Sequence, residues 1–341
     1  MEKGKDDMIK DNWKERYANQ VNESVSSEFF TLVKLHNEIA KATFMFFADK
    51  GMQYVPVPAT TGAASSPMEP GSDSEPVVIQ VKNRSTKLTD SAQFHLEYTC
   101  RSSKVGSFFY GHSFRDEEPD DRHLAQFNHA EAEIVGTLED VKRLVEQYVK
   151  YITKFIWRNL KDDLNDIPGI ENRVHSLLSK EFVFQSISYK EACKTLEGYS
   201  NALKRCESGS FRISPKGEKI LMEKLGEFIW IECWDRMAVP FYQAFNPQSG
   251  FALNADLLFG IGEVVGAGQR HFEANSLLCA LDEHGLSVDD YKWYVDMKRQ
   301  YPLQTSGFGM GVERYLMWLL NIQDIRSVEV FTRNRFQIGE I

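Results

Sequence analysis

The chain has 341 residues, 42% of them hydrophobic and 26% charged, and a formal net charge of −9 at pH 7. This is the composition of an ordinary globular protein, and no apolar run approaches the ~20 residues of a membrane span. The charged N-terminus lacks the apolar stretch of a signal peptide, so we expect a cytoplasmic protein with no membrane contact. The acidic balance argues mildly against nucleic-acid binding, which depends on basic contacts to phosphate.

The five cysteines are odd in number, and none forms a C-x-x-C pair. This pattern argues against a disulfide framework and against a zinc site. We interpret the cysteines as reduced thiols that serve mostly as small apolar residues.

The expected elements begin with a polar leader and end with a buried helix. In chain order they are a loosely attached leader at 1–28, a helix at 29–47, a strand at 54–57, a loop at 61–76, strands at 77–81 and 107–114, and a helical piece between them at 92–98. Then come helices within 138–197 with a strand-like break at 182–187, strands at 228–233, 238–244 and 256–259, helices at 277–284 and 288–301, and a glycine-rich turn opening a helix in 306–322. Helices that cluster rather than alternate with strands favour an α+β fold.

A polar loop between two strand-like runs predicts a hairpin, with Arg115 and His123 on either side of the loop. If the residues around Phe127 form a strand, Glu131 and Glu133 share its face, because side chains alternate every two residues. Arginine binds phosphate oxygens bidentately and an aromatic ring stacks on adenine, so the hairpin is a candidate nucleotide clamp. The alternative is a surface hairpin with ordinary ion pairs.

Two acidic residues, Asp256 and Glu263, lie in an apolar, glycine-rich segment that suits Mg²⁺ held together with substrate phosphates. Its glycines would let the backbone approach a ligand closely. Arg270 closes the segment as a charge that could meet a carboxylate. The alternative is a tight turn with an exposed ion pair.

Three glycines, Gly307, Gly309 and Gly311, precede a helix that carries Arg314. Their spacing is not that of a dinucleotide-binding fingerprint, and no βαβ unit follows. Glycines before a helix could place the guanidinium of Arg314 against phosphate. The alternative is a flexible turn followed by a helix with Arg314 in solvent.

Taken together, these segments supply the groups that ATP, Mg²⁺ and an amino acid require. The cations are Arg115, Arg270 and Arg314, the metal-type ligands are Asp256 and Glu263, and the acceptors for an ammonium group are Gln93 and Glu131. This set does not suggest hydride transfer, a Ser-His-Asp triad or a zinc hydrolase.

Several ordered motifs resemble the class II aminoacyl-tRNA synthetases, in the aspartyl/asparaginyl/lysyl subgroup and nearest to its asparaginyl members. GMQYVPVPAT, with Pro58, resembles the first motif; SFRDEE, RHLAQF and EAE resemble the second; GFGMGVERYLMWLLNIQDIRSVEVFTR resembles the third. The similarity covers about residues 28–335. It implies a catalytic domain at 29–341 built on an antiparallel sheet flanked by helices, with a helical insertion at about 138–222. The first motif also implies a homodimer.

The resemblance implies an ATP site in the hairpin and the last helix. Arg115 would contact the α-phosphate and hold the attacking carboxylate in line, Glu117 would face the adenine, and Phe127 would stack on it. His123 and Arg314 would steady the outer phosphates. Arg115 and Arg314 would be the catalytic groups, acting by positioning and charge neutralisation.

The resemblance also implies a metal site and an amino-acid site. Asp256 and Glu263 would hold Mg²⁺, with Glu263 next to the ATP as well. The amino-acid site would consist of Ser91, Gln93, Glu131 and Arg270. Gln93 and Glu131 would bind the amino end or a side-chain amide, and Arg270 would meet a substrate carboxylate.

Three features depart from the family pattern. Only 28 residues are available ahead of the expected catalytic domain, whereas the family's anticodon-binding OB domain needs roughly a hundred, so we expect no such domain. The loop DEEPDD at 116–121 is acidic where relatives are commonly basic, and it would repel phosphate. Thr305 stands where the family usually has histidine.

We therefore expect an ATP-dependent ligase that adenylates aspartate, asparagine or a close analogue and transfers it to ammonia or another amine. Anticodon-domain-less relatives of this kind include AMP-forming asparagine synthetases. One alternative is aminoacylation of tRNA or a carrier protein, which the acidic loop disfavours. The other is a catalytically silent paralog that senses an amino acid.

Overall fold

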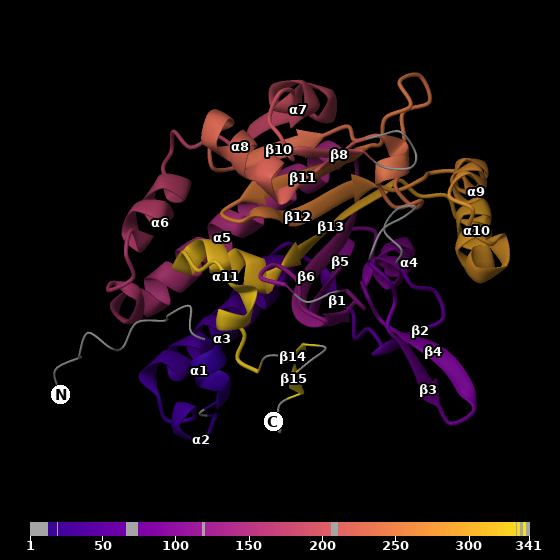
Figure 1. Cartoon of the computed structure of the whole chain (residues 1–341). Coiled ribbons are helices and arrows are strands. Elements are labelled where there is room, and N and C mark those ends of the chain that lie inside the picture. Colours follow the sequence, from indigo (N-terminus) through magenta and orange to yellow (C-terminus); the bar gives the residue numbers. More distant parts are fainter. Residues whose placement is uncertain are drawn as a thin grey trace.

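The computed structural model of the chain (Figure 1) describes residues 13–18, 20–65, 74–117, 120–205, 211–331, 333–334 and 337–338. Its centre is an eight-stranded sheet in the order β1-β5-β6-β13-β12-β11-β10-β7. The strands are β1 (Gln53–Tyr54), β5 (Gly106–Phe114), β6 (Gln126–Val135), β13 (Thr305–Gly311), β12 (Gly262–Gln269), β11 (Asn254–Phe259), β10 (Ile229–Glu232) and β7 (Gln185–Ser188). The six inner strands are antiparallel, and the two edge strands pair in parallel. The α+β fold is confirmed.

Three helices cover one face of the sheet. They are α3 (Ser27–Asp49), α5 (Leu138–Leu164) and α11 (Val312–Leu320). Ser26 starts α3 by accepting a hydrogen bond from the Phe29 amide at 3.0 Å, and Thr137 with Asp140 forms a capping box for α5. Apolar residues of these helices pack on alternate residues of the strands and form the main core. The expected insertion therefore opens with α5, a helix that belongs to this core.

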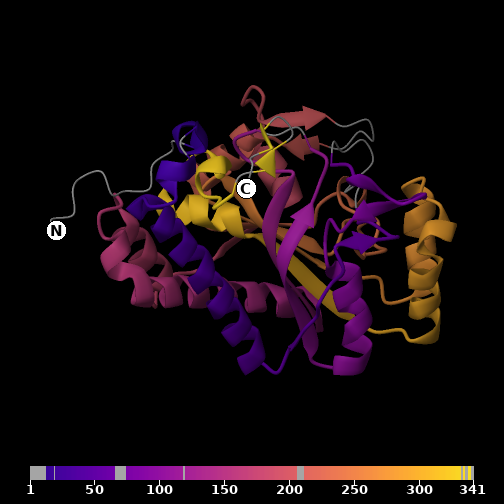
Figure 2. The ribbon, with the colours of Figure 1, turned by 90° about the horizontal axis from the view of Figure 1, so that it is seen from below.

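The opposite face carries α4 (Gln93–Ser103), α9 (Ala274–Glu283) and α10 (Lys292–Gln300), as Figure 2 shows. Phe94 of α4 packs with α9 and α10 in a second apolar cluster. Phe109 of β5 packs with Ala92 and Leu96 on the same side. The space between the middle of the sheet and α4 is the place where polar side chains gather.

Smaller elements surround the sheet. They are β2 (Thr60–Thr61), β3 (Val78–Val81), β4 (Arg84–Leu88), α6 (Ile170–Leu178), α7 (Tyr189–Leu196), β8 (Leu203–Arg205), β9 (Phe211–Ile213), α8 (Pro215–Leu225), β14 (Arg333–Asn334) and β15 (Gln337–Ile338). Ser214 caps α8, and Pro215 occupies its first turn. Helix α8 packs against β11 and β12, and it thereby reaches the centre of the sheet.

The N-terminal segment is not loosely attached where the structure describes it. It forms α1 (Trp13–Ala18) and α2 (Gln20–Glu23). The Trp13 indole donates to Asp324 at 2.9 Å, and Arg16 donates to the backbone oxygen of Ser327 at 2.8 Å. The aromatic ring and the guanidinium fasten the segment to the C-terminal part of the chain. Residues 1–12 and residues 66–73 of the expected loop at 61–76 lie outside the described residues.

Two expected elements differ. The segment at 238–244 is not a strand: Arg236–Ala238 forms a 3₁₀ turn, and Pro240 lacks the N–H that a sheet ladder requires. The carbonyl groups of Val239 and Phe241 instead contact histidine rings at 3.1 and 3.0 Å. The glycines at 307–311 lie in strand β13 rather than in a turn, and the strand leads directly into α11.

Candidate active site

Alternate residues of β6 form a row of functional side chains on the α4 face of the sheet. Phe127, Glu131 and Glu133 share this face, as the two-residue period predicts, and His129 lies between them. The neighbouring strand β13 has glycines opposite this row: Gly309 pairs with Glu131 and Gly307 with Glu133. A Cβ atom on Gly307 would come within 1.8 Å of Glu133 Oε2. The glycines therefore make room for the carboxylates.

Glu131 is a buried carboxylate at the N-terminus of α4. Ser91 Oγ and the Ala92 amide donate to its two oxygens, each at 2.5 Å. Burial raises the pKa of Glu131 to about 7, although these donors and Arg115 lower it. The Nε2 group of Gln93 is buried, and the side chain of Gln93 interacts with the Tyr242 hydroxyl. The structure thus brings together Ser91, Gln93 and Glu131, three of the four residues of the expected amino-acid site.

Glu133 and Arg270 form a buried bidentate ion pair. Nε of Arg270 lies 3.0 and 3.3 Å from the two carboxylate oxygens, and Nη2 lies 2.9 Å from Oε2. The carboxylate raises the pKa of Arg270, so the guanidinium is charged. Tyr242 covers it at 5.4 Å from the ring centre. We expected Arg270 to be available for a substrate carboxylate, whereas the structure already gives its charge a partner.

A second buried ionic group supports this pair from α4 and α10. Lys298 is fully buried and bonds to Glu97, which also accepts from the Tyr294 hydroxyl at 2.5 Å. Arg101 adds an ion pair to Glu97 at 3.3 Å. Positive and negative groups balance each other here, which is the condition under which buried charges are tolerated.

The expected hairpin is present, formed by β5 and β6. The Arg115 guanidinium lies 5.4 Å from the centre of the Phe127 ring, and Arg115 Nε is buried without a hydrogen-bond partner among the described residues. This arrangement brings together the cation and the aromatic ring of a nucleotide clamp. His123 faces its own loop: Nδ1 lies 2.8 Å from Asp120, and Nε2 lies 3.9 Å from Glu117.

Asp256 and Glu263 come together across β11 and β12. A Cβ atom on Gly266, the strand partner of Asp256, would lie 3.7 Å from Asp256 Oδ1 and 3.4 Å from Glu263 Oε1. Burial and the neighbouring charges of Glu263 and Glu218 raise the pKa of Asp256 well above its usual value. Carboxylates that repel one another in this way fit a bound cation. Across the described residues, no three His, Cys, Asp or Glu side chains are placed to hold a metal by themselves.

Cations surround these two carboxylates. Arg314 Nη1 donates to the Glu263 carbonyl oxygen at 2.9 Å. Arg122 pairs with Glu218 of α8 at 2.7 Å, and a Cβ atom on Gly262 would collide with both side chains. Carboxylates next to arginines match the charges of a metal–triphosphate complex.

Four residues at the site were not assigned a role from the sequence: Glu133, His129, Arg122 and Glu218. The two-residue period places Glu133 and also His129 on the functional face. The pairing of Arg122 with Glu218 joins segments 96 positions apart, so no local pattern indicates it.

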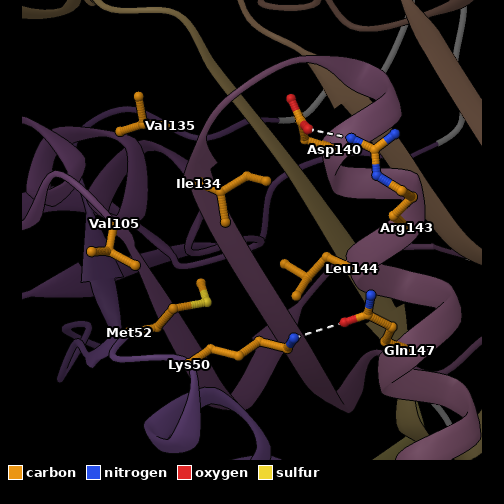
Figure 3. Close-up of a pocket in the computed structure, with 9 residues that line it drawn as sticks. All are labelled: Lys50, Met52, Val105, Ile134, Val135, Asp140, Arg143, Leu144 and Gln147. Atoms are coloured by element: carbon orange, nitrogen blue, oxygen red, sulfur yellow. Dashed lines mark hydrogen bonds and ion pairs between the residues drawn. The ribbon is translucent and has the colours of Figure 1, made fainter.

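Figure 3 shows a surface pocket away from this site. Its volume is about 260 Å³, and it lies between the end of α3 and the start of α5. The polar side chains in it pair with each other, Asp140 with Arg143 and Lys50 with Gln147. None of its lining residues belongs to the candidate active site. Within the described part of the chain, no helix is long and apolar enough to cross a membrane.

Comparison with known proteins gives one consistent family. A family model described as tRNA synthetases class II (D, K and N) matches residues 10–335. An asparagine–tRNA ligase of Koribacter versatilis is 31% identical over 316 residues, which are 90% of this chain and 69% of that protein. That of Malacoplasma penetrans is 28% identical over 322 residues, or 91% and 71% of the two chains.

Solved structures agree with these relatives. The asparaginyl-tRNA synthetase of Entamoeba histolytica in complex with asparaginyl-adenylate superimposes with a TM-score of 0.82 at 26% identity, over 96% of this chain and 72% of that one. The Pyrococcus horikoshii enzyme complexed with asparaginyl-adenylate has a TM-score of 0.85 at 23% identity, over 97% and 75%. At 23% identity, the likeness to the Pyrococcus horikoshii structure shows a shared fold.

Proposed function

The chain belongs to the class II tRNA synthetases (D, K and N), and we propose that it uses ATP to activate asparagine as an aminoacyl-adenylate. It is an ATP-dependent ligase that forms an aminoacyl-adenylate. The choice of asparagine, the metal and the acceptor are our proposals.

The Glu133–Arg270 pair is the observation that supports asparagine rather than aspartate as the substrate. A substrate carboxylate at this position would find the charge of Arg270 already compensated and would lie against the carboxylate of Glu133. An amide would fit both groups, because its oxygen accepts from Arg270 and its NH₂ donates to Glu133. A site built from a donor and an acceptor rejects a ligand that leaves one of them unpaired. The pair therefore favours asparagine over aspartate.

The neighbouring groups fit the rest of the substrate. Glu131 offers a carboxylate to the α-ammonium group, and its Ser91 and Ala92 donors hold it in place. Arg115 and Phe127 would hold the α-phosphate and the adenine. The amino acid's carboxylate would then lie in line with the α-phosphorus, which makes the reaction effectively unimolecular.

Asp256 and Glu263 would hold Mg²⁺ together with phosphate oxygens and water. When bound, the metal neutralises charge on the triphosphate and on the departing pyrophosphate. Arg314, at the start of α11 beside Glu263, would contact the outer phosphates. These groups act by electrostatic stabilisation and require no proton transfer.

Two acceptors for the activated amino acid are candidates. The relatives are named as ligases of asparagine and tRNA, which favours the end of a tRNA. Against it, the hairpin loop is acidic at Asp116, Glu117, Asp120 and Asp121, which favours a cationic acceptor such as an amine.

A second copy of the chain would cover the exposed apolar side chains near the first motif. Phe44 and Met45 of α3 and Tyr54 of β1 are exposed there, and the rings of Phe44 and Tyr54 lie 5.0 Å apart. Sedimentation velocity of the wild type and of Met45→Glu would test this dimer, because a charge at the interface would shift the protein towards monomer.

The test of the main proposal is amino-acid-dependent exchange of pyrophosphate into ATP, without RNA. We expect exchange with asparagine, weaker exchange with aspartate, and loss of exchange when EDTA removes divalent cations. Exchange with aspartate above that with asparagine would refute the proposed specificity. No exchange with any amino acid, in folded protein, would refute activation in the absence of RNA.

A further inference from the structure

In the proposed binding mode, His129 would lie beside the reacting carbonyl group. On β6 it stands between Phe127, the proposed adenine platform, and Glu131, the proposed ammonium site. Each is two residues away, or about 7 Å along the strand. The rings of His129 and Phe127 are 5.3 Å apart. In an aminoacyl-adenylate the carbonyl carbon connects the amino end to the phosphate, so the carbonyl would lie over the middle of this row.

The hydrogen-bond partners of His129 determine which of its ring nitrogens could accept a proton. Nδ1 lies 3.1 Å from Ser113 Oγ and 3.1 Å from Glu131 Oε1. When Glu131 is ionised, its carboxylate accepts but cannot donate, so Nδ1 carries the proton and Nε2 has a lone pair. No described residue hydrogen-bonds to Nε2. It occupies the space left by the missing side chain of Gly309, where a Cβ atom would be 2.6 Å away.

The charges around His129 keep it neutral. Burial and the cations Arg115 and Arg314 lower its pKa well below the usual value, so the ring is unprotonated at pH 7. The facing charged groups are Glu131 on the same strand, Arg115 at the end of β5 and Arg314 on α11. A bound adenylate would place its phosphate against Arg115 and offset the effect of that cation, which moves the pKa of His129 back towards its usual value, while burial still lowers it.

We propose that His129 is a catalytic base that accepts the proton of an amine as the amine attacks the aminoacyl-adenylate. The nitrogen lone pair forms a C–N bond with the carbonyl carbon. The bond from that carbon to the AMP oxygen breaks, and its electron pair leaves with AMP. The surplus proton of the nitrogen goes to Nε2 and then to solvent. Glu131 orients the ring through Nδ1.

The acidic loop favours an amine over RNA as the nucleophile. Glu117 contacts His123 near the phosphate-binding groups, and it acts electrostatically on Arg314. Asp116, Asp120 and Asp121 add negative charge along the same loop. An RNA phosphate would be repelled here, whereas a protonated amine would be attracted. Such an amine first loses one proton to solvent, which frees its lone pair. The second proton, which is released as the C–N bond forms, is the one that His129 accepts.

The test compares transfer with activation in the same preparation. The role of His129 rests on the proposed function, so activation and transfer are measured separately. Pyrophosphate exchange reports activation. Single-turnover formation of an amide from ammonium chloride or methylamine reports transfer. For His129→Gln we expect the ratio of transfer rate to exchange rate to fall by at least about 100-fold, the lower range of general-base catalysis. His112→Gln, an exposed histidine on the opposite face of β5, is the matched control.

Two further readouts separate a base from a structural role. At a constant concentration of unprotonated amine, the wild-type ratio should fall towards acid pH, and the variant's ratio should be flat. Added imidazole should raise transfer by His129→Ala. If either variant loses exchange, asparaginyl-adenylate supplied directly measures transfer by itself. An unchanged ratio in His129→Gln, or transfer by the wild type to tRNA but to neither amine, would overturn the proposal. Absence of exchange in the wild type would instead refute the proposed function.

Discussion

Nε and Nη2 of Arg270 donate to both carboxylate oxygens of Glu133, at 2.9–3.3 Å, across 137 positions of the chain. Both side chains are buried, and Tyr242 lies over the guanidinium. The pair thus presents a charge-balanced donor and acceptor to any ligand that reaches it, rather than a free cation.

Glu133→Gln should shift the amino-acid preference towards aspartate. The variant leaves the charge of Arg270 uncompensated, so a substrate carboxylate gains a partner. We expect the ratio of kcat/KM for asparagine to that for aspartate to fall by about 10-fold or more. Pyrophosphate exchange with each amino acid measures it. Glu223→Gln removes the same charge from the surface of α8 and serves as control; an unchanged ratio in Glu133→Gln would contradict the assignment.

Arg115→Ala should abolish most of the activation while the fold remains intact. The guanidinium lies against Phe127, and its Nε has no hydrogen-bond partner among the described residues, so removal breaks little internal structure. We expect pyrophosphate exchange to fall by about 100- to 1000-fold, as for the loss of one transition-state donor. Arg143→Ala, on the surface of α5, is the control. Wild-type exchange in Arg115→Ala would show that the hairpin is not the nucleotide clamp.

The affinity for the amino acid should rise with pH. Burial raises the pKa of Glu131 to about 7, so the carboxyl group is mostly protonated at pH 6 and mostly ionised at pH 8. Only the ionised form attracts the substrate's ammonium group. We therefore expect the KM for asparagine to increase as pH falls below about 7. In Glu131→Gln the KM should be high and independent of pH over this range; a flat profile in the wild type would argue against the role of Glu131.

Lys298→Met should destabilise the protein strongly. The change leaves Glu97 buried with weaker compensation, although Tyr294 and Arg101 still contact it. Breaking a buried ion pair by removing one partner costs about 3–5 kcal/mol. Urea unfolding measures the loss. Lys292→Met, on the same helix but exposed, should cost about 1 kcal/mol or less. Equal losses in the two variants would show that burial of the pair is not what stabilises α10.

The local patterns of the sequence indicate the sheet and much of the site, because strand periodicity is a local property. The period of two around Phe127 correctly predicts that Glu131 and Glu133 share its face. The partners of these side chains come from distant segments, and periodicity contains no information about them. The ion pair of Arg122 with Glu218 is of this kind: it depends on how α8 packs against β12.

The strand at 238–244 was predicted wrongly for a similar reason. Its apolar residues have strand-like character, but Pro240 interrupts the ladder, and its carbonyl groups have side-chain partners instead. Those partners, His271 and His284, lie tens of residues away in the chain. Apolar composition alone does not distinguish a strand from a buried irregular segment.

The glycines of β13 lie in a strand, although a glycine-rich segment before a helix predicts a turn. Glycine usually marks a turn by its backbone freedom, but Gly307 and Gly309 have ordinary strand conformations, and they are needed because they lack a side chain. A Cβ atom on Gly307 would lie 1.8 Å from Glu133 Oε2 and 2.7 Å from the Ala132 carbonyl oxygen. The second atom is backbone and cannot move aside easily.

Gly307→Ala should therefore both destabilise the protein and displace Glu133 from Arg270. Overpacking of this kind costs about 1–3 kcal/mol, and the loss of exchange with asparagine should exceed what that instability explains. Gly62→Ala, where a Cβ atom meets nothing within 4 Å, is the matched control. Urea unfolding and pyrophosphate exchange on both variants measure the effects. Gly307→Ala with wild-type exchange would mean that Glu133 tolerates displacement, and the Glu133–Arg270 pair would then not determine the amino acid.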